Sequence, residues 1–235
     1  MTAYITGGSR GIGAACVKTL TASGWRVGFT YRKSMEQAVA LAENTNSIAV
    51  YADVAEDSDV RAAFQKLRES LGKPDALICN AGIAEQKQFQ DITDTDWHMM
   101  LNTNLMGAVH AVRAVLPSML HRKRGAIVLV SSMWGQSGAS CESHYAASKA
   151  ALIGLGKSLA LELGLSGIRV NCVAPGVIRT DMNAMHNTET LQALAEETPL
   201  HRLGTAEEVA DSIAYLVSDK ASFITGQVLG VTGGF

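Results

Sequence analysis

The chain opens with an apolar run, Ala3-Tyr4-Ile5-Thr6, which leads into Gly7-Gly8-Ser9-Arg10-Gly11-Ile12-Gly13 and then into a helical run over Ala14–Ala22. Glycines between a strand and a helix let the backbone approach a ligand closely, and the helix N-terminus offers free N–H groups with partial positive charge. The spacing is Gly-x-x-x-Gly-x-Gly, not the common Gly-x-Gly-x-x-Gly. Such glycines could form a merely flexible turn. Their place between a strand and a helix favours a phosphate-binding turn.

Short apolar runs alternate with amphipathic stretches along the rest of the chain, which is typical of βαβ units and a parallel sheet. The expected strands are Ala3–Thr6, Arg26–Tyr31, Ser47–Ala52, Ala76–Cys79, Ala126–Ser131, Arg169–Ala174 and Val228–Val231. Long helices are expected over Asp96–Leu120 and Ser143–Leu165. No linker, repeat or low-complexity tract interrupts residues 1–235. The sequence therefore predicts one doubly wound α/β domain, with a seven-stranded parallel sheet and helices on both faces.

Composition excludes several classes of function. Hydrophobic residues at 47% and charged residues at 18% can fill a core on both faces of a sheet. A net charge of −2 provides no basic field for nucleic acid or an anionic membrane. No apolar run reaches about 18 residues, so neither a membrane span nor a signal peptide is expected. The 4 cysteines and 6 histidines show no metal-ligand spacing, and reduced thiols in a cytoplasmic protein are the simplest expectation.

A second pattern lies in mid-chain, where Tyr145 follows Ser132 by thirteen residues and Lys149 follows Tyr145 by four. Residues four apart on a helix share a face. A lysine ammonium beside a phenol favours the phenolate, so we expect Lys149 to lower the pKa of Tyr145 from about 10. Such a tyrosine can exchange a proton with a carbonyl or alcohol oxygen. Taken alone, the pair also fits a partly buried tyrosine beside a lysine stem.

Four further segments accompany these two patterns: Asp53-Val54, Asn80-Ala81-Gly82, Asn104 at the start of Asn-Leu-Met-Gly, and Pro175-Gly176-Val177 with Thr180. In this order, and over the whole chain, they resemble the short-chain dehydrogenase/reductase family. Two positions depart from its pattern: Cys79 stands where many members have Asn, and Thr232 stands where Asp usually precedes the terminal Gly-Gly. Neither departure touches the chemistry, although Thr232 bears on packing at the C-terminus.

The resemblance implies a Rossmann-type fold and a reductase that transfers hydride from a nicotinamide cofactor to a ketone. Ser132 and Tyr145 would hold the ketone oxygen, Tyr145 would supply the proton, and Lys149 would bind the nicotinamide ribose. Asn104 would hold a water linked to Lys149. Ser131 is a rival to Ser132, and the thirteen-residue spacing favours Ser132. The implied cofactor contacts are Thr6, Gly7, Ser9, Arg10, Gly11, Ile12, Gly13, Arg32, Asp53, Val54, Asn80, Ala81, Gly82, Tyr145, Lys149, Pro175, Gly176, Val177, Ile178 and Thr180.

Charge bears on which cofactor is used. NAD-binding proteins place an acidic residue near the end of the second strand to hold the ribose 2′-hydroxyl. Here that position reads Tyr31-Arg32-Lys33, and Arg10 lies in the glycine turn. Arg10 and Arg32 could pair with a 2′-phosphate, whereas the alternative is that Arg32 and Lys33 are ordinary solvated charges. We expect NADPH/NADP+ as the cofactor.

The substrate is inferred from two resemblances. Overall the chain is similar to the 3-oxoacyl-(acyl-carrier-protein) reductase branch, although Ser166 stands where those enzymes commonly present an arginine to the carrier. The segment Ser131–Glu142 is similar to that of elongation factor P 5-aminopentanone reductases, which reduce a ketone linked to a lysine of a protein. Trp134 could wall the pocket and Glu142 could pair with a cationic amine, or both could be structural. We expect a ketone carried on a protein, with the aminopentanone group first and the 3-oxoacyl group as the alternative.

Several expectations concern the rest of the chain. Residues Asp181–Leu203, with Met182 as a substrate contact and a helix near Glu189–Glu197, are expected to cover the substrate. Small residues in the helix over Ser143–Leu165 allow close approach in the core or between subunits, and the resemblance implies a homotetramer or homodimer. A non-catalytic NADP(H) sensor would keep the glycine turn but could dispense with the tyrosine and lysine. An epimerase or dehydratase would need a larger C-terminal region than the chain offers.

Overall fold

The structure is a computed structural model that describes residues 1–180 and 188–235. Seven strands form one parallel sheet in the order β3-β2-β1-β4-β5-β6-β7. The strands are β1 (Thr2–Thr6), β2 (Arg26–Tyr31), β3 (Ile48–Tyr51), β4 (Ala76–Cys79), β5 (Gly125–Val130), β6 (Ile168–Pro175) and β7 (Val228–Val231). Each boundary lies within one residue of the expected one, so the predicted seven-stranded parallel sheet is confirmed.

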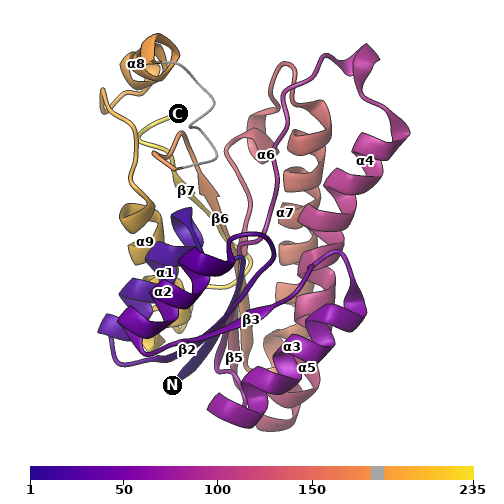
Figure 1. Ribbon diagram of the computed structural model, residues 1–235, viewed down its shortest axis with the longest axis vertical. Helices are drawn as coiled ribbons and strands as arrows, with labels where there is room; N and C mark the ends of the chain where they lie inside the picture. The colour runs from indigo at the N-terminus through magenta and orange to yellow at the C-terminus, as the bar shows by residue number, and fades with distance from the viewer. Residues whose placement is uncertain (181–187) are drawn as a thin grey trace.

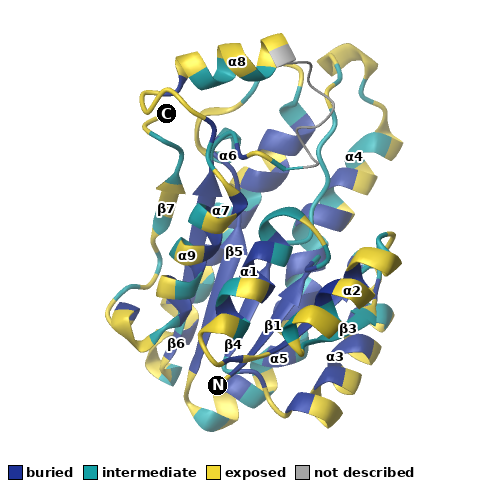
Figure 2. Ribbon diagram, turned by 60° about the vertical axis from the view of Figure 1, so that its left-hand side comes forward, coloured by how far each residue is buried: buried dark blue, intermediate teal, exposed yellow. Residues whose placement is uncertain are grey.

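Helices cover both faces of this sheet (Figure 1). On one face lie α1 (Gly11–Ala22), α2 (Met35–Thr45) and α9 (Ala206–Val217). On the other lie α3 (Asp57–Leu71), α5 (Gly107–Arg122) and α7 (Ser143–Leu163). Figure 2 shows the central strands as buried ribbons between the two layers. This is the doubly wound Rossmann-type arrangement that the sequence predicts.

Side chains of the central strands alternate between two hydrophobic cores. In β5, Val128 packs into the core under α1 and α9, whereas its neighbours Ile127 and Leu129 pack into the core under α3, α5 and α7. Successive side chains on a strand point to opposite faces, and a parallel sheet covered on both sides must therefore be apolar at every position. This double burial explains why the strands read as continuous apolar runs.

The helix expected over Asp96–Leu120 is present, but a wider, π-helical segment divides it into two α-helices. α4 (Asp94–Leu101) starts with a capping box in which the Thr93 and Asp96 side chains bond each other's backbone N–H groups. A π-helical segment, η2 (Asn102–Met106), separates α4 from α5. π-helical turns inside longer helices occur frequently at functional sites. Here the turn carries Asn104, whose side chain bonds the backbone of Ile83 on both its N–H and C=O groups.

Shorter elements complete the described chain: η1 (Phe89–Asp91), α6 (Trp134–Ser137), η3 (Gly164–Ser166), α8 (Thr188–Glu197) and η5 (Asp219–Ala221). The helix expected over Ser143–Leu165 ends at Leu163, and η3 follows it. The chain then turns at Gly167, whose φ is +67°. A left-handed residue after a helix is a common terminator, and glycine adopts it without strain. α8 covers the segment where the sequence predicts a helix near Glu189–Glu197.

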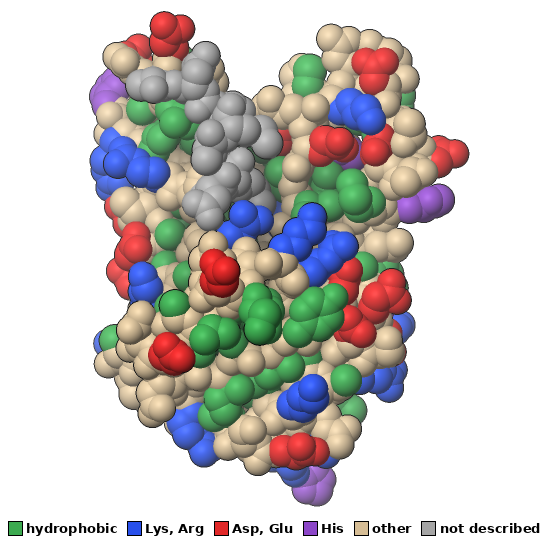
Figure 3. Space-filling view, viewed as in Figure 1, with side chains coloured by type: hydrophobic (Ala, Val, Ile, Leu, Met, Phe, Trp, Pro, Cys, Tyr) green, Lys and Arg blue, Asp and Glu red, His purple; other side chains and the backbone are tan. Residues whose placement is uncertain are grey.

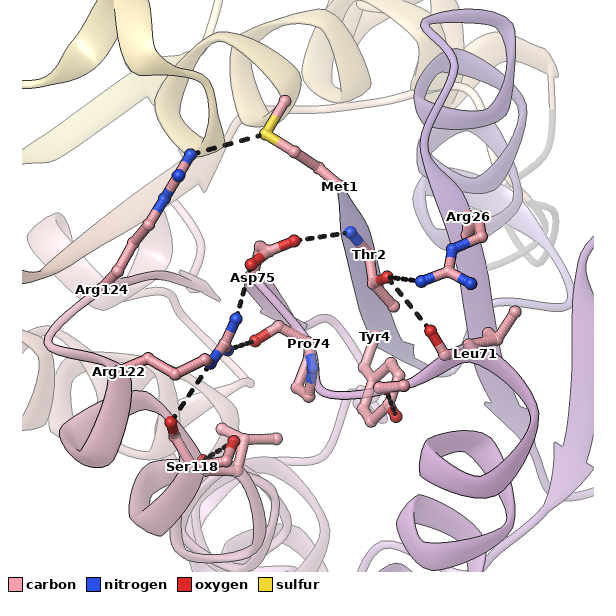
Figure 4. A network of polar contacts seen from close by, with 12 residues as sticks. Met1, Thr2, Tyr4, Arg26, Leu71, Pro74, Asp75, Ser118, Arg122 and Arg124 are labelled. Carbon is pink, nitrogen blue, oxygen red and sulfur yellow. Dashed lines mark hydrogen bonds and ion pairs between the residues drawn. The ribbon is translucent and has the colours of Figure 1, made fainter.

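A polar network ties together the amino ends of the strands, at the edge of the sheet opposite the glycine turn (Figure 4). The Asp75 carboxylate accepts hydrogen bonds from the Thr2 N–H at 2.9 Å and from Arg122 Nη1 at 2.7 Å. Arg122 also donates to the Pro74 carbonyl oxygen. This network links β1, β4 and the end of α5.

Among the described helices, none combines the length and the apolar character that a membrane crossing requires.

Candidate active site

The glycine turn joins β1 to α1 at the carboxyl edge of the sheet. Gly7 has a φ of +66°, and a Cβ atom there would lie 2.8 Å from the Cα of Ala81. A Cβ on Gly13 would lie 2.1 Å from the Gly7 oxygen. Arg10 at the N-cap makes no side-chain cap bond, and the first turn of α1 holds no acidic residue. The turn therefore leaves the N–H groups of the helix N-terminus available to an anion.

The turns after β1 and β4 are bonded to each other. Thr6 Oγ1 accepts hydrogen bonds from the N–H groups of Asn80 and Ala81, both at 3.1 Å. Asn80 Nδ2 donates to the Gly7 oxygen at 2.9 Å. Thr6 and Gly13, predicted as cofactor contacts, do not line a cavity. They stabilise the conformation of the turn instead, because the Thr6 hydroxyl is hydrogen-bonded to backbone N–H groups and Gly13 packs against Gly7.

A first cavity, the dinucleotide cavity, lies over the carboxyl ends of β1, β2 and β3. It brings together twelve predicted cofactor residues: Gly7, Ser9, Arg10, Gly11, Ile12, Arg32, Asp53, Val54, Asn80, Ala81, Gly82 and Thr180. Seven further lining residues were not predicted from the sequence: Thr30, Tyr31, Lys33, Ser34, Ala52, Ile83 and Thr103. Most of these directly precede or follow a predicted contact, which is the signal that could have found them.

The dinucleotide cavity is positively charged at its β2 end. Arg10, Arg32 and Lys33 line it, and Figure 3 shows Lys and Arg side chains gathered below the hollow between the two upper lobes. Arg32 Nε lies 2.9 Å from Asp53 Oδ2, so these two predicted cofactor contacts form an ion pair within the cavity. The glycine turn, the helix N-terminus and the basic end of the cavity are together suited to bind the phosphate groups of a dinucleotide.

A second cavity, the substrate cavity, continues from the first. Ile12, Asn80, Gly82 and Thr180 line both. The remaining predicted residues that line it are Ser132, Trp134, Glu142, Tyr145, Lys149, Pro175, Gly176, Val177 and Ile178. Thr190 and Leu194 of α8 line it too, so the segment expected to cover the substrate does reach the cavity. Met182 lies outside the described residues.

Ser132 and Ser131 have different partners. Ser131 Oγ donates to the Lys149 carbonyl oxygen at 2.8 Å and is buried. Ser132 accepts a hydrogen bond from the Trp134 N–H at 3.2 Å and shares a hydrogen bond with the Tyr145 hydroxyl. Alternation along the end of β5 thus leaves Ser131 to brace α7 and brings Ser132 to the tyrosine.

Lys149 and Asn104 approach each other across Gly82. A Cβ atom on Gly82 would lie 3.2 Å from Asn104 Oδ1 and 3.3 Å from Lys149 Nζ. Asn104 is buried behind the cavity rather than lining it, and its Nδ2 also donates to Ser148 Oγ at 2.9 Å. A side chain at position 82 would crowd both polar atoms, and glycine avoids this.

Comparisons with known proteins agree with this geometry. Residues 7–235 match the sequence model of the family described as enoyl-(acyl carrier protein) reductase. The chain is 37% identical to 3-oxoacyl-(acyl-carrier-protein) reductase FabG of Staphylococcus aureus over 237 residues, covering 99% of this chain and 96% of the relative. It is 36% identical to FabG of Escherichia coli over 233 residues, with the same coverage. The chain belongs to the short-chain dehydrogenase/reductase family.

A solved structure supports the same assignment. The crystal structure of 3-oxoacyl-(acyl-carrier protein) reductase from Brucella melitensis is similar with a TM-score of 0.93 and 34% sequence identity, covering 100% of this chain and 90% of that one. As a short-chain dehydrogenase/reductase, the protein is an oxidoreductase that acts on a ketone or alcohol group with a nicotinamide cofactor. Within the described ranges, no three His, Cys, Asp or Glu side chains are grouped to hold a metal ion.

The electrostatics of Tyr145 differ from the expectation. Burial raises the pKa of Tyr145, the hydrogen bond from Ser132 opposes this, and the charge of Glu142 adds to the rise. Lys149 Nζ donates to the Val130 oxygen at 2.9 Å and lies 5.7 Å from the centroid of the Tyr145 ring. The prediction that Lys149 lowers the pKa of Tyr145 is wrong for this arrangement, because the ammonium faces a carbonyl and the ring rather than the hydroxyl. Burial lowers the pKa of Lys149 itself to about 8.

The outer part of the substrate cavity is acidic. Glu142, at the N-cap of α7, accepts a hydrogen bond from Gln86 Nε2 at 3.4 Å. Glu85 and Gln86, in the loop after β4, line the cavity as well and were missed by the residue analysis. His144 is fully buried, with Nε2 3.2 Å from Glu85 Oε2. Only tertiary structure reveals this contact, because 59 positions separate the two residues.

Proposed function

We propose that the protein is an NADPH-dependent ketone reductase in which Tyr145 donates the proton. One observation carries the proposal: Ser132, Tyr145 and Lys149 together line a cavity that continues directly from the dinucleotide cavity. Two hydroxyls beside a bound nicotinamide are suited to hold and protonate a carbonyl oxygen.

The roles of the residues follow from their surroundings. The chemistry that a nicotinamide cofactor would supply, when bound, is hydride transfer to the carbonyl carbon. Ser132 donates a hydrogen bond to the carbonyl oxygen and orients it. Tyr145 transfers its phenolic proton to that oxygen as the alcohol forms, and the raised pKa keeps this proton on the phenol until it is needed. Lys149 would hold the nicotinamide ribose, and Asn104 would hold a water linked to Lys149, by which Tyr145 would regain its proton.

NADPH is the proposed form of the cofactor. Arg10, Arg32 and Lys33 line the dinucleotide cavity where the adenosine ribose would lie, and no acidic residue ends β2. A 2′-phosphate would accept charge-assisted hydrogen bonds from the arginines, whereas a ribose 2′-hydroxyl would gain little from them.

The proposed substrate is a ketone carried on a protein, and the relatives favour a 3-oxoacyl group on an acyl carrier protein. Those relatives are named for that substrate and share more than a third of this sequence. A ketone that bears an amine, such as the aminopentanone group of modified elongation factor P, is the second candidate. Glu142 at the cavity favours it, since a carboxylate would pair with an ammonium group.

A homotetramer or homodimer through α5 and α7 is also proposed. Ala147, Ala150 and Gly154 lie exposed along α7, and the small side chains would let a second copy approach closely. The cytoplasmic location stays a prediction.

The decisive experiment measures NADPH oxidation with a panel of ketones. The panel contains acetoacetyl thioesters of an acyl carrier protein and elongation factor P that carries the aminopentanone group. Turnover of the thioester with at least tenfold higher kcat/KM would support the 3-oxoacyl proposal, and the reverse ratio would support the aminopentanone proposal. NADPH binding without oxidation in the presence of any ketone would indicate a non-catalytic sensor instead.

A further inference from the structure

Glu85 and Glu142 give the substrate cavity an unusual balance of charge. Both carboxylate residues line it, whereas Lys149 is the one basic residue among the described lining residues. Lys149 is buried and donates to the Val130 oxygen, so its charge is directed away from the entrance. A substrate that reaches Tyr145 therefore passes two carboxylates, and a cationic group on it would be attracted there.

The Glu85 carboxylate is held in place by a buried histidine. His144 has no exposed surface, and its Nε2 lies 3.2 Å from Glu85 Oε2. Its Nδ1 has no hydrogen-bond partner among the described residues. With Nε2 as the donor, the imidazole orients the Glu85 carboxylate, and the ring itself is fixed because it is fully buried.

The backbone around Glu85 is fixed on both sides. Before it, the N–H of Ile83 donates to Asn104 Oδ1 at 2.8 Å. After it, the Lys87 N–H donates to the Cys141 oxygen at 2.7 Å, and Lys87 Nζ forms a 2.6 Å ion pair with Asp96. The loop that carries Glu85 is thus fastened to the π-helical turn, to α4 and to the chain just before α7. A side chain on such a loop can select substrates, because little ordering is left to occur on binding.

We propose that Glu85 is a specificity-determining residue that selects ketones bearing a cationic group, and that His144 is its positioning residue. The inference rests on the proposed ketone reduction and assigns the charge of the substrate at the same cavity. Glu85 would accept a charge-assisted hydrogen bond from the cationic group while the ketone oxygen lies between Ser132 and Tyr145. Glu142, on the N-terminal end of α7, would contribute a second negative charge.

The test uses three methyl ketones of matched length that end in a dimethylammonium group, an isosteric isopropyl group or a carboxylate. A tertiary amine cannot condense with the ketone to an imine, so the cationic probe stays open. The readout is the ratio of kcat/KM for the dimethylammonium ketone to that for the isopropyl ketone, measured with NADPH. The variants are Glu85→Gln and Glu142→Gln, with Glu43→Gln on the exposed face of α2 as the control for net charge.

Glu85→Gln should lower this ratio about tenfold or more through KM, because one hydrogen bond to a charged group is lost. Glu43→Gln should keep the wild-type ratio. The carboxylate ketone should be the poorest substrate of the wild type and should improve in Glu85→Gln. A ratio that Glu85→Gln leaves within twofold of wild type would overturn the proposal, even if Glu142→Gln lowers it. No oxidation of NADPH with any of the three ketones would instead reject the proposed reductase function.

His144 is tested by a pair of variants. His144→Phe keeps a ring beside Trp97, whose centroid lies 5.9 Å from the imidazole, but it removes the donor to Glu85. His144→Gln keeps an amide donor at a similar reach. The dimethylammonium-to-isopropyl ratio of kcat/KM should fall in His144→Phe. In His144→Gln, the decrease in the logarithm of this ratio should be at most half of the decrease in His144→Phe. Equal ratios in the two variants, at equal melting temperatures, would show that His144 does not position Glu85.

Discussion

Arg32 Nε lies 2.9 Å from Asp53 Oδ2, and this ion pair connects the end of β2 to the chain just after β3 within the dinucleotide cavity. Arg32 is about half exposed, so the pair alone adds little stability. It does fix the position of the Arg32 guanidinium, which we propose to bind the 2′-phosphate of NADPH.

We expect a preference for NADPH over NADH that depends on Arg32. Arg32→Ala should reduce the ratio of kcat/KM for NADPH to that for NADH by about 10- to 150-fold, because a charge-assisted contact is worth roughly 1.5–3 kcal/mol. Calorimetric binding of NADP+ and NAD+ should show the same change. Arg61→Ala, which breaks a similar ion pair with Asp57 on α3, is the control and should keep the ratio. Equal use of both cofactors by the wild type would contradict the proposal.

Tyr145→Phe should lower kcat by about 10²–10⁴-fold while NADPH binding persists, since only the proton donor is removed. Steady-state assays give kcat, and quenching of protein fluorescence gives the affinity for NADPH. Tyr215→Phe, at a half-exposed tyrosine of α9, should behave as wild type. More than a tenth of wild-type kcat in Tyr145→Phe would favour the sensor hypothesis.

Lys149→Met should make the cofactor-free protein more stable at pH 7. Burial lowers the pKa of Lys149 from 10.5 to about 8, so the folded state carries the cost of a buried charge below pH 8. That cost is relieved as pH rises from 8 to 10.5, because the folded protein loses the proton before the unfolded chain does. After about 1 kcal/mol for the lost bond to Val130 is subtracted, we expect a gain of about 2 kcal/mol at pH 7 that shrinks above pH 8 and becomes a loss of about 1 kcal/mol by pH 10.5.

Urea unfolding across this pH range measures that gain. Lys157→Met, on the exposed side of the same helix, controls for the change of residue type and should show no such pH dependence. A Lys149→Met protein that is less stable than wild type at pH 7 would contradict the prediction. It would show that the hydrogen bonds and packing of Lys149 fully offset the desolvation cost of its buried ammonium.

Asp75→Asn should destabilise the protein by about 1 kcal/mol at pH 7, because two bonds in the network at the amino ends of the strands (Figure 4) lose their charged acceptor. Burial alone would raise the pKa of Asp75, but the Thr2 N–H and Arg122 hold it below its usual 3.8. This contribution is present above pH 4 and is lost as pH falls through the lowered value.

The measurement is the difference in unfolding free energy between wild type and Asp75→Asn from pH 7 to pH 2. The difference should shrink below pH 4. Asp219→Asn, at an exposed pair with Arg124, is the matched control and should change stability by only a few tenths of a kcal/mol. A difference that stays constant down to pH 2 would exclude a role for the Asp75 charge.

The substrate side of the site was only partly predictable from the chain. Spacing selected Ser132, Tyr145 and Lys149, because helix periodicity is a local rule. The directions of these side chains depend on tertiary contacts. The Lys149 ammonium donates to the Val130 oxygen, and the pKa of Tyr145 is raised by burial, whereas the sequence predicted a lowered pKa. Desolvation depends on every layer packed around a group, and no spacing encodes it.

The sequence by itself determined the order of strands and helices, the parallel sheet and the glycine turn, since apolar periodicity and glycine geometry act over a few neighbouring residues. Tertiary structure alone decided that Glu85 meets His144, that Asp53 holds Arg32, and that a π-helical turn brings Asn104 to Ile83. These contacts join segments that follow β2, β3, β4 and β5 at the carboxyl edge of the sheet. Their side chains become neighbours only when the strands pair, so the charge of the substrate cavity is a property of the folded chain.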